Sequence, residues 1–232
     1  MKLGLALATL FVAGTNSFTI DASRAADQST HSPPDPRIAL IDQAASDGNS
    51  EKVQALINEK PDLVFSKDPW NRAPLIWAVQ GNREEVVKLL LANHADPNAR
   101  DDASTTYPDG ESALQLAVRT DAVAIAKLLL ADNAAFTIHD AAGLGDVTRV
   151  SSLLQTNPSL VFSKRAGRTP LHEAAYHGQA KVATVLIAAG ALVSAKDVGG
   201  QTPLHGAALG AHSGSRKDVA QILIGSVLFN IF

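Results

Sequence analysis

Cysteine is absent from this sequence and aromatic residues are scarce. Without cysteine the chain has no disulfide, no thiolate metal site and no cysteine nucleophile. Aromatic residues make up only 5% of the 232 residues, so a hydrophobic core must be built mainly from Ala, Leu, Val and Ile. This composition suits closely packed helix pairs. The formal net charge of -3 gives no indication of a nucleic-acid partner.

Motifs of catalysis and cofactor binding are also lacking. His172, Glu173 and His177 come close to the zinc-binding H-E-x-x-H motif, but the two histidines are five residues apart. On a helix this spacing separates them by about 140°, so they share no face. Gly143 and Gly145 lack the preceding strand and following lysine of a phosphate-binding loop. We therefore predict a protein that is not an enzyme and has no metal site and no cofactor.

Residues 1–26 are predicted to be a secretory signal peptide. An apolar stretch, Leu3–Val12, is followed by small residues around Ser23-Arg24-Ala25, which suits cleavage after Ala25. An uncleaved anchor is the alternative, but a spanning helix needs about 20 apolar residues, and Thr15-Asn16-Ser17 interrupts this one early. We expect an exported protein, periplasmic or secreted, with no membrane span in the mature chain. Residues 27–36 are polar and proline-rich, which predicts a linker.

From residue 37 to residue 232 a helix–turn–helix pattern recurs. Its clearest copy spans 167–190, where Thr169-Pro170 begins a helix, Gly178 ends it and Gly190 ends a second, apolar helix. Thr169-Pro170-Leu171-His172 returns as Thr202-Pro203-Leu204-His205. This pattern resembles the ankyrin repeat, whose period is about 33 residues. The resemblance implies an all-α solenoid of about six helix–turn–helix repeats with short β-hairpin-like loops, the last repeat atypical or truncated. It also implies that His172 and His205 hold adjacent loops together.

The break between the two helices of each unit tests this alignment. Backbone with positive φ is needed there, and Gly, Asn and Asp adopt it most readily. The first five units have such residues at the break: Gly48, Asn82, Asp121, Gly145 and Gly178. His94 stands at a helix end where glycine would be usual, which favours a capping role.

A longer duplication divides the repeats into two blocks. Leu63–Lys67 recurs as Leu160–Lys164, 97 residues later, which is about three ankyrin periods. We predict insertions at Ser104–Pro108 and at His212–Ser215, and a short junction without a full hairpin at Ala134–Thr137. The chain ends on an apolar stretch, Val227–Phe232, where a polar cap would be usual. This end is either truncated or a self-association surface, and we otherwise expect a monomer.

The resemblance implies partner binding through the hairpin tips and the exposed face of the first helices. Aromatic and arginine side chains on one surface are typical of binding hot spots. We therefore predict a concave site for another protein with an acidic or mixed-charge surface. The alternative is that the aromatics pack on neighbouring hairpins and the arginines are solvated. The predicted binding residues are Trp70, Arg72, Gln80, Tyr107, Glu111, Arg119, Arg165, Arg168, Tyr176 and His177, with Pro69, Asp109 and Gln201 also at tips.

Overall fold

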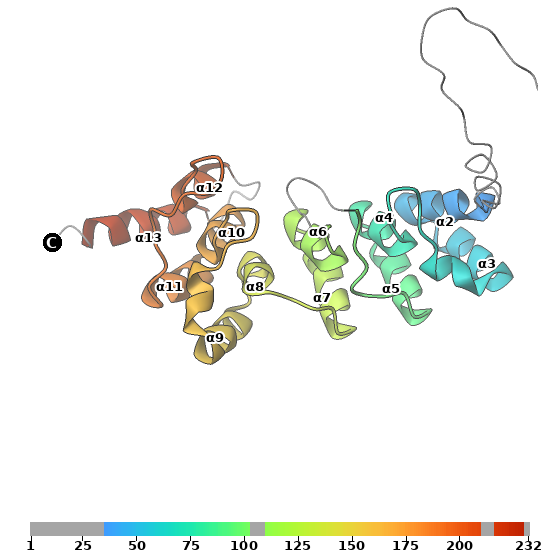
Figure 1. The fold of residues 1–232 in the computed structure, drawn as a ribbon, viewed down its shortest axis with the longest axis horizontal. Coiled ribbons are helices and arrows are strands. Elements are labelled where there is room, and N and C mark those ends of the chain that lie inside the picture. The colour runs from blue at the N-terminus through green and yellow to red at the C-terminus, as the bar shows by residue number, and fades with distance from the viewer. Residues whose placement is uncertain (1–34, 103–109, 210–215, 230–232) are drawn as a thin grey trace, which may run out of the picture. The chain divides into compact units, whose positions relative to one another are not determined.

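The computed structural model describes residues 35–102, 110–209 and 216–229. In this part the helices form two rows (Figure 1), in which paired helices contact each other across the rows and most neighbouring helices contact each other along a row. The inner row consists of α2 (Pro36–Asp47), α4 (Pro74–Gln80), α6 (Ala113–Arg119), α8 (Ile138–Leu144), α10 (Pro170–Tyr176) and α12 (Pro203–Leu209). The outer row consists of α3 (Ser50–Glu59), α5 (Glu84–Ala92), α7 (Val123–Ala131), α9 (Val147–Thr156), α11 (Ala180–Ala188) and α13 (Arg216–Phe229). Two short 3-10 turns, η2 (Pro61–Phe65) and η3 (Pro158–Phe162), follow α3 and α9.

Small residues let the inner helices pack closely. Ala78, Ala117, Ala141 and Ala174 occupy equivalent positions on four inner helices, and each is almost fully buried. Two of the loops between helix pairs carry isolated antiparallel bridges, at Arg100–Ser112 and Arg165–Arg168. The all-α repeat architecture is therefore confirmed.

The predicted breaks between paired helices all have positive φ. Gly48, Asn82, Asp121, Gly145 and Gly178 have φ of 83°, 54°, 58°, 74° and 68°. The breaks after α5, α7 and α11 also have positive φ, at His94 (65°), Asn133 (63°) and Gly190 (92°), whereas α3 and α9 end on the extended residues Lys60 and Asn157. The turn positions are therefore set by backbone conformation even where the glycine itself is replaced.

Two hydrophobic clusters divide the helices at the predicted junction. One runs from Ile41 to Ala134 and the other from Ile138 to Leu223. Between them α7 ends at Ala131 and α8 begins at Ile138, so the fourth repeat has no hairpin. This division agrees with the duplication in the sequence, and we call the two halves the first and second block.

The boundaries differ from the prediction in one place. Helix α2 begins at Pro36, inside the segment predicted as linker, because proline suits a first helical position and the Asp35 carboxylate accepts from the Arg37 N–H at 3.0 Å. The predicted signal peptide, both predicted insertions, Tyr107 and Asp109 lie outside the described residues. Among the helices that the structure describes, none has the length and apolar character to cross a bilayer.

Candidate functional site

Histidines on the inner helices connect successive hairpins. The Thr169 N–H donates to His172 Nδ1 at 3.1 Å, and His172 Nε2 lies 3.0 Å from the Gln201 carbonyl oxygen. The neutral imidazole therefore accepts at Nδ1 and donates at Nε2. Burial lowers the pKa of His172, which keeps it in this form. His205 repeats the first contact, because the Thr202 N–H donates to its Nδ1 at 3.2 Å.

His139 on α8 also contacts the hairpin that follows, a role that was not predicted from the sequence. Its Nε2 lies 3.1 Å from the Arg168 carbonyl oxygen, and burial, assisted by the charge of Arg165, lowers its pKa to about 4. The Thr-Pro-Leu-His signature is absent from this repeat. The available signal was position alone, because His139 precedes His172 by one ankyrin period of about 33 residues.

Trp70 and Arg72 belong to a cluster in the first block. The Arg72 guanidinium lies between two indole rings, 4.8 Å from the centroid of Trp70 and 3.8 Å from that of Trp77. Arg72 Nε donates to the Asp68 carboxylate at 2.9 Å. Trp70 nevertheless keeps 61% of its surface exposed, so it is available for contact despite this packing. Gln80 is exposed at the end of the neighbouring helix α4.

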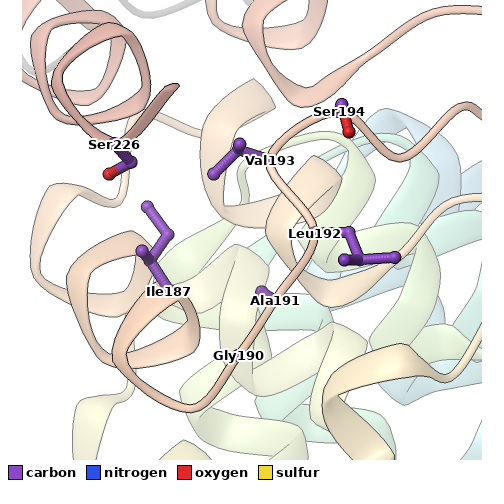
Figure 2. Close-up of a pocket in the computed structure, with 7 residues that line it drawn as sticks. All are labelled: Ile187, Gly190, Ala191, Leu192, Val193, Ser194 and Ser226. Carbon is purple, nitrogen blue, oxygen red and sulfur yellow. The ribbon is translucent and has the colours of Figure 1, made fainter. Parts of the chain in front are cut away.

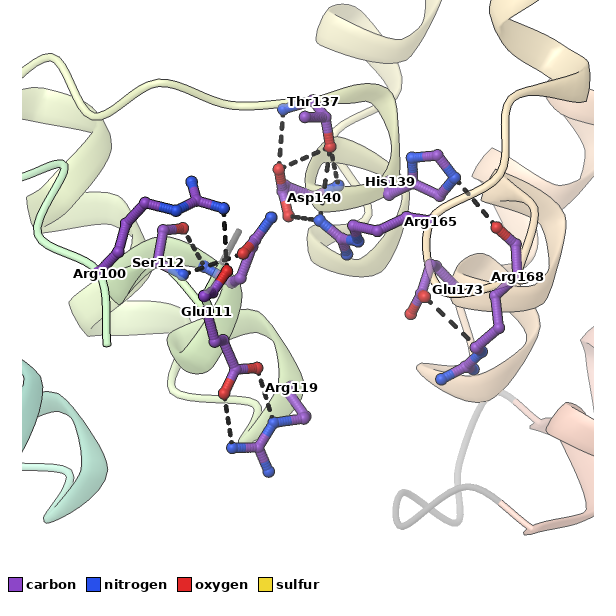
Figure 3. A network of polar contacts seen from close by, with 12 residues as sticks. Arg100, Glu111, Ser112, Arg119, Thr137, His139, Asp140, Arg165, Arg168 and Glu173 are labelled. Atoms are coloured by element: carbon purple, nitrogen blue, oxygen red, sulfur yellow. Dashed lines mark hydrogen bonds and ion pairs between the residues drawn. The ribbon is translucent and has the colours of Figure 1, made fainter. Parts of the chain in front are cut away.

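Five of the predicted residues line one pocket between α6 and α10, which we call the junction pocket. It has a volume of about 260 Å³. Figure 3 shows the polar contacts of several of its side chains, among them Arg119, Arg165 and Arg168. The lining residues are Gln115, Val118, Arg119, Arg165, Arg168, Glu173, Tyr176 and His177.

The missing hairpin of the fourth repeat explains where this pocket lies. Arg165, from the hairpin before α10, reaches back to the Asp140 carboxylate and to Thr137 Oγ1 at 3.5 Å (Figure 3). Gly143 on α8 has no side chain. A Cβ there would lie 2.5 Å from Val118 Cγ1 and 3.3 Å from His177 Cδ2. Residues of α6 and α10 therefore approach each other over α8.

Each arginine among the predicted residues already faces a carboxylate of the chain. Arg119 donates to both oxygens of Glu111, at 2.8 and 3.0 Å. The other pairs are Arg72 with Asp68, Arg165 with Asp140, and Arg168 with Glu173 at 3.6 Å. These arginines are thus neither simply solvated nor uncompensated positive charges.

Glu173 is a buried carboxyl in the wall of the junction pocket. Burial raises its pKa above the usual range, Arg168 and Arg165 lower it, and Asp140 raises it. Among the described residues, no group of three or more His, Asp and Glu side chains is placed to hold a metal ion. The site is therefore suited to charge pairing and aromatic contact.

A second, apolar pocket of about 420 Å³ lies between the loop after α11 and helix α13 (Figure 2). Its lining was not predicted as a site. Leu192 in this wall keeps 60% of its surface exposed. The lining residues are Ile187, Gly190, Ala191, Leu192, Val193, Ser194 and Ser226.

Stacked helix pairs joined by hairpin loops define a repeat protein. A family model for ankyrin repeats in three copies matches residues 7–101 and 138–230, and one for ankyrin repeats in many copies matches 75–130. The chain belongs to the ankyrin-repeat family. The first match begins inside the predicted signal peptide, whose cleavage stays a prediction.

Two curated proteins are similar in sequence to about two thirds of this chain. A probable 26S proteasome regulatory subunit p28 of Saccharomyces cerevisiae is 27% identical over 65% of this chain and 69% of its own length. The palmitoyltransferase AKR1 of Lachancea kluyveri is 28% identical over 67% of this chain, but only 22% of its own length is matched.

A solved structure supports the fold. One chain from the complex of the predatory endopeptidase Bd0816 of Bdellovibrio bacteriovorus with immunity protein Bd3460 matches with a TM-score of 0.55 at 26% identity. The match covers 80% of this chain and 96% of that chain.

Proposed function

We propose that this chain is a non-catalytic binding protein that recognises a partner protein through its inner helices and hairpin tips. The observation that carries the proposal is the junction pocket, where Arg119, Arg168 and Tyr176 come together from two repeats. Ankyrin repeats generally mediate protein–protein interaction, and a regulatory proteasome subunit and a chain of an endopeptidase–immunity protein complex among the similar proteins fit a binding role.

The charges favour a mixed-charge partner surface. Because Arg72, Arg119 and Arg165 face carboxylates of their own chain, a uniformly acidic partner would compete with these ion pairs. A partner with single acidic side chains among polar and apolar ones could contact both the exposed Trp70 ring and the half-buried Tyr176 ring. Export to the periplasm or the outside is part of this proposal, and it rests on residues 1–26 of the sequence.

A pull-down with a matched control tests the proposal. The full chain, an Arg119→Ala/Tyr176→Ala variant and a Lys127→Ala/Lys181→Ala variant are compared on extracts of the cell envelope. Both control lysines are exposed on outer helices. A captured partner is then titrated by calorimetry. We expect the pocket variant to lose at least about tenfold in affinity, as for hot-spot residues, and the control to bind normally.

Equal affinity for both variants, with circular dichroism unchanged, would contradict binding at the junction pocket. It would direct attention to the second candidate, self-association near the C-terminus. That candidate is favoured by the apolar pocket of Figure 2 and by the exposed Leu192 and Leu209. Sedimentation velocity of the chain with and without residues 227–232 tests it. A shift from oligomer to monomer on deletion supports self-association, and identical sedimentation of both forms contradicts it.

A further inference from the structure

Among the arginines of the junction pocket, Arg168 has the longest ion pair. Its Nε lies 3.6 Å from Glu173 Oε1, beyond the usual N–H···O distance of about 2.7–3.2 Å. Its other described contacts are a 3.4 Å bond from Nη2 to the His172 carbonyl oxygen and stacking over Tyr176, 4.9 Å from the ring centroid. The neighbouring Arg119, by contrast, holds Glu111 through two short bonds. Arg168 is therefore the guanidinium whose counter-charge is most easily exchanged.

Glu173, the counter-charge of Arg168, lies in an unfavourable place for a carboxylate. It is 7% exposed on α10, and the charged groups facing it come from several elements. Arg165 and Arg168 come from the hairpin before α10, and Asp140 comes from α8. Two further groups line the same pocket, Arg119 from α6 and His177 at the end of α10. A second anion in this space would face both Glu173 and Asp140.

We propose that the junction pocket seats one carboxylate side chain of the partner, which replaces Glu173 as the counter-charge of Arg168 while Glu173 takes up a proton from solvent. This inference rests on the proposed function and names the chemistry of the group recognised. Two carboxylates that share a small buried site do not both stay ionised. The incoming carboxylate gains a planar guanidinium suited to bidentate contact. Neutral Glu173 remains beside it as a hydrogen-bond donor.

Proton uptake makes the affinity depend on pH. Burial already raises the pKa of Glu173, which favours uptake of the proton. Since the complex holds one more proton than its separate parts, binding strengthens as pH falls, by at most about tenfold per pH unit. His177 is a second titratable group in the wall of the same pocket, so a measurement at Glu173 itself is needed.

Nuclear magnetic resonance on the labelled full chain tests the proposal with a defined probe. The probe is the peptide acetyl-Gly-Glu-Gly-amide, and acetyl-Gly-Gln-Gly-amide is its neutral control. We expect the acidic peptide to shift the Nε–Hε signal of Arg168 and to leave that of Arg72, in the first block, in place. The Glu173 Cδ signal should move towards its protonated position as peptide is added. The affinity should be higher at about pH 5.5 than at about pH 7.5, by at most about tenfold per pH unit.

Two variants separate Glu173 from His177. Glu173→Gln has no ionisable group to protonate, so it should bind the acidic peptide more tightly and with little pH dependence. His177→Gln should keep the pH dependence of the unchanged chain. The measurement of the Glu173 Cδ signal needs no variant, so it tests proton uptake by Glu173 even if either variant misfolds.

Other outcomes would overturn the inference without touching the proposed function. A shift of Arg168 with Glu173 ionised throughout would exclude the exchange of counter-charges. Equal effects of the two peptides would exclude a carboxylate site. In both cases the proposed binding of a partner through Arg119 and Tyr176 would remain valid. Loss of partner binding in the calorimetric experiment is measured separately and bears on the proposed function alone.

Discussion

Asp42 on α2 is a buried carboxyl group without a complete set of hydrogen bonds. Its Oδ1 has no hydrogen-bond partner among the described residues. Burial raises its pKa to about 7, the carboxylate of Asp68 raises it too, and Arg72 lowers it. An unpartnered buried oxygen next to another carboxylate costs stability in the ionised form. Asp42 therefore marks a position where the first block is less stable than its packing allows.

We expect Asp42→Asn to stabilise the protein at alkaline pH. An unfolded aspartate ionises near pH 3.9, so between about pH 4 and pH 7 the unfolded state loses a proton that the folded state keeps. The free energy of unfolding therefore falls as the pH rises through this window. The difference in pKa sets a ceiling of about 4 kcal/mol, and because an amide also remains buried we expect about 2 kcal/mol at pH 8.

Urea unfolding at several pH values measures this effect. Asp47→Asn is the matched control, because Asp47 is exposed on the same helix. The Asp42→Asn variant should gain stability over the parent only as the pH rises above about 4. Parallel pH curves for parent and variant would contradict a raised pKa at Asp42.

At the scale of helices and turns, the left-handed residue that follows an outer helix affects the stability of its repeat. His94 follows α5 with φ 65°, whereas Gly190 follows α11 with φ 92°. A left-handed conformation costs a residue with a Cβ about 1–2 kcal/mol. Glycine avoids this cost but loses about 0.5–1 kcal/mol through the freedom of the unfolded chain. The net balance favours glycine at both breaks.

His94→Gly should therefore raise the free energy of unfolding by about 0.5–1 kcal/mol. The reverse change, Gly190→Ala, should lower it by a similar amount. A new Cβ at Gly190 would have no atom within 4 Å, so backbone strain alone is measured there. Urea unfolding at one pH gives both values. A destabilised His94→Gly would show that the imidazole contributes a capping contact worth more than the strain.

Turn positions could be predicted from the sequence because they depend on backbone conformation. Gly48, Asn82 and Asp121 differ in chemistry but share positive φ, and this requirement is visible residue by residue. The charge pairs were not predictable in this way. Arg165 and Asp140 are 25 residues apart, and their contact depends on how two repeats stack. The bonds of Arg119 to Glu111, by contrast, lie within one repeat, because the two residues stand at opposite ends of α6.

The sequence predicted residues that line the junction pocket, but it did not predict the pocket itself. The sequence indicated that no hairpin fits at Ala134–Thr137 and that aromatics and arginines line the tips. It did not indicate that omitting one hairpin brings residues of α6 and α10 around a common space over Gly143. The described residues form a pocket there. Which of them bind a partner stays a prediction.

At the scale of the whole repeat array, the buried apolar side chains of the described residues fall into two clusters, one in each block. In repeat proteins each unit contacts only its neighbours, so stability is a sum of local contributions and interfaces. Contacts that cross the junction include Ala135 N–H to Asn98 Oδ1 at 2.7 Å and His177 Nδ1 to Asp121 Oδ1 at 3.7 Å. Both are polar, the buried apolar side chains belong to two clusters, and Leu144 of α8 packs against the first of them.

We therefore expect unfolding in two steps that different signals resolve. The two tryptophans of the chain, Trp70 and Trp77, both lie in the first block, so their fluorescence reports this block alone. Far-ultraviolet circular dichroism reports the helices of both blocks. Leu90 on α5 and Leu186 on α11 are equivalent and fully buried. Replacing either by alanine should cost about 2–5 kcal/mol in its own block.

In urea, Leu90→Ala should lower the midpoint of the fluorescence transition, while Leu186→Ala should lower part of the dichroism transition and leave fluorescence nearly unchanged. This asymmetry follows because each leucine belongs to one cluster only. Equal displacement of both signals by both variants would mean that the junction couples the blocks into one cooperative unit. The junction pocket would then sit in a continuous rigid groove, whereas separate steps would place it between two blocks that a seated partner holds together.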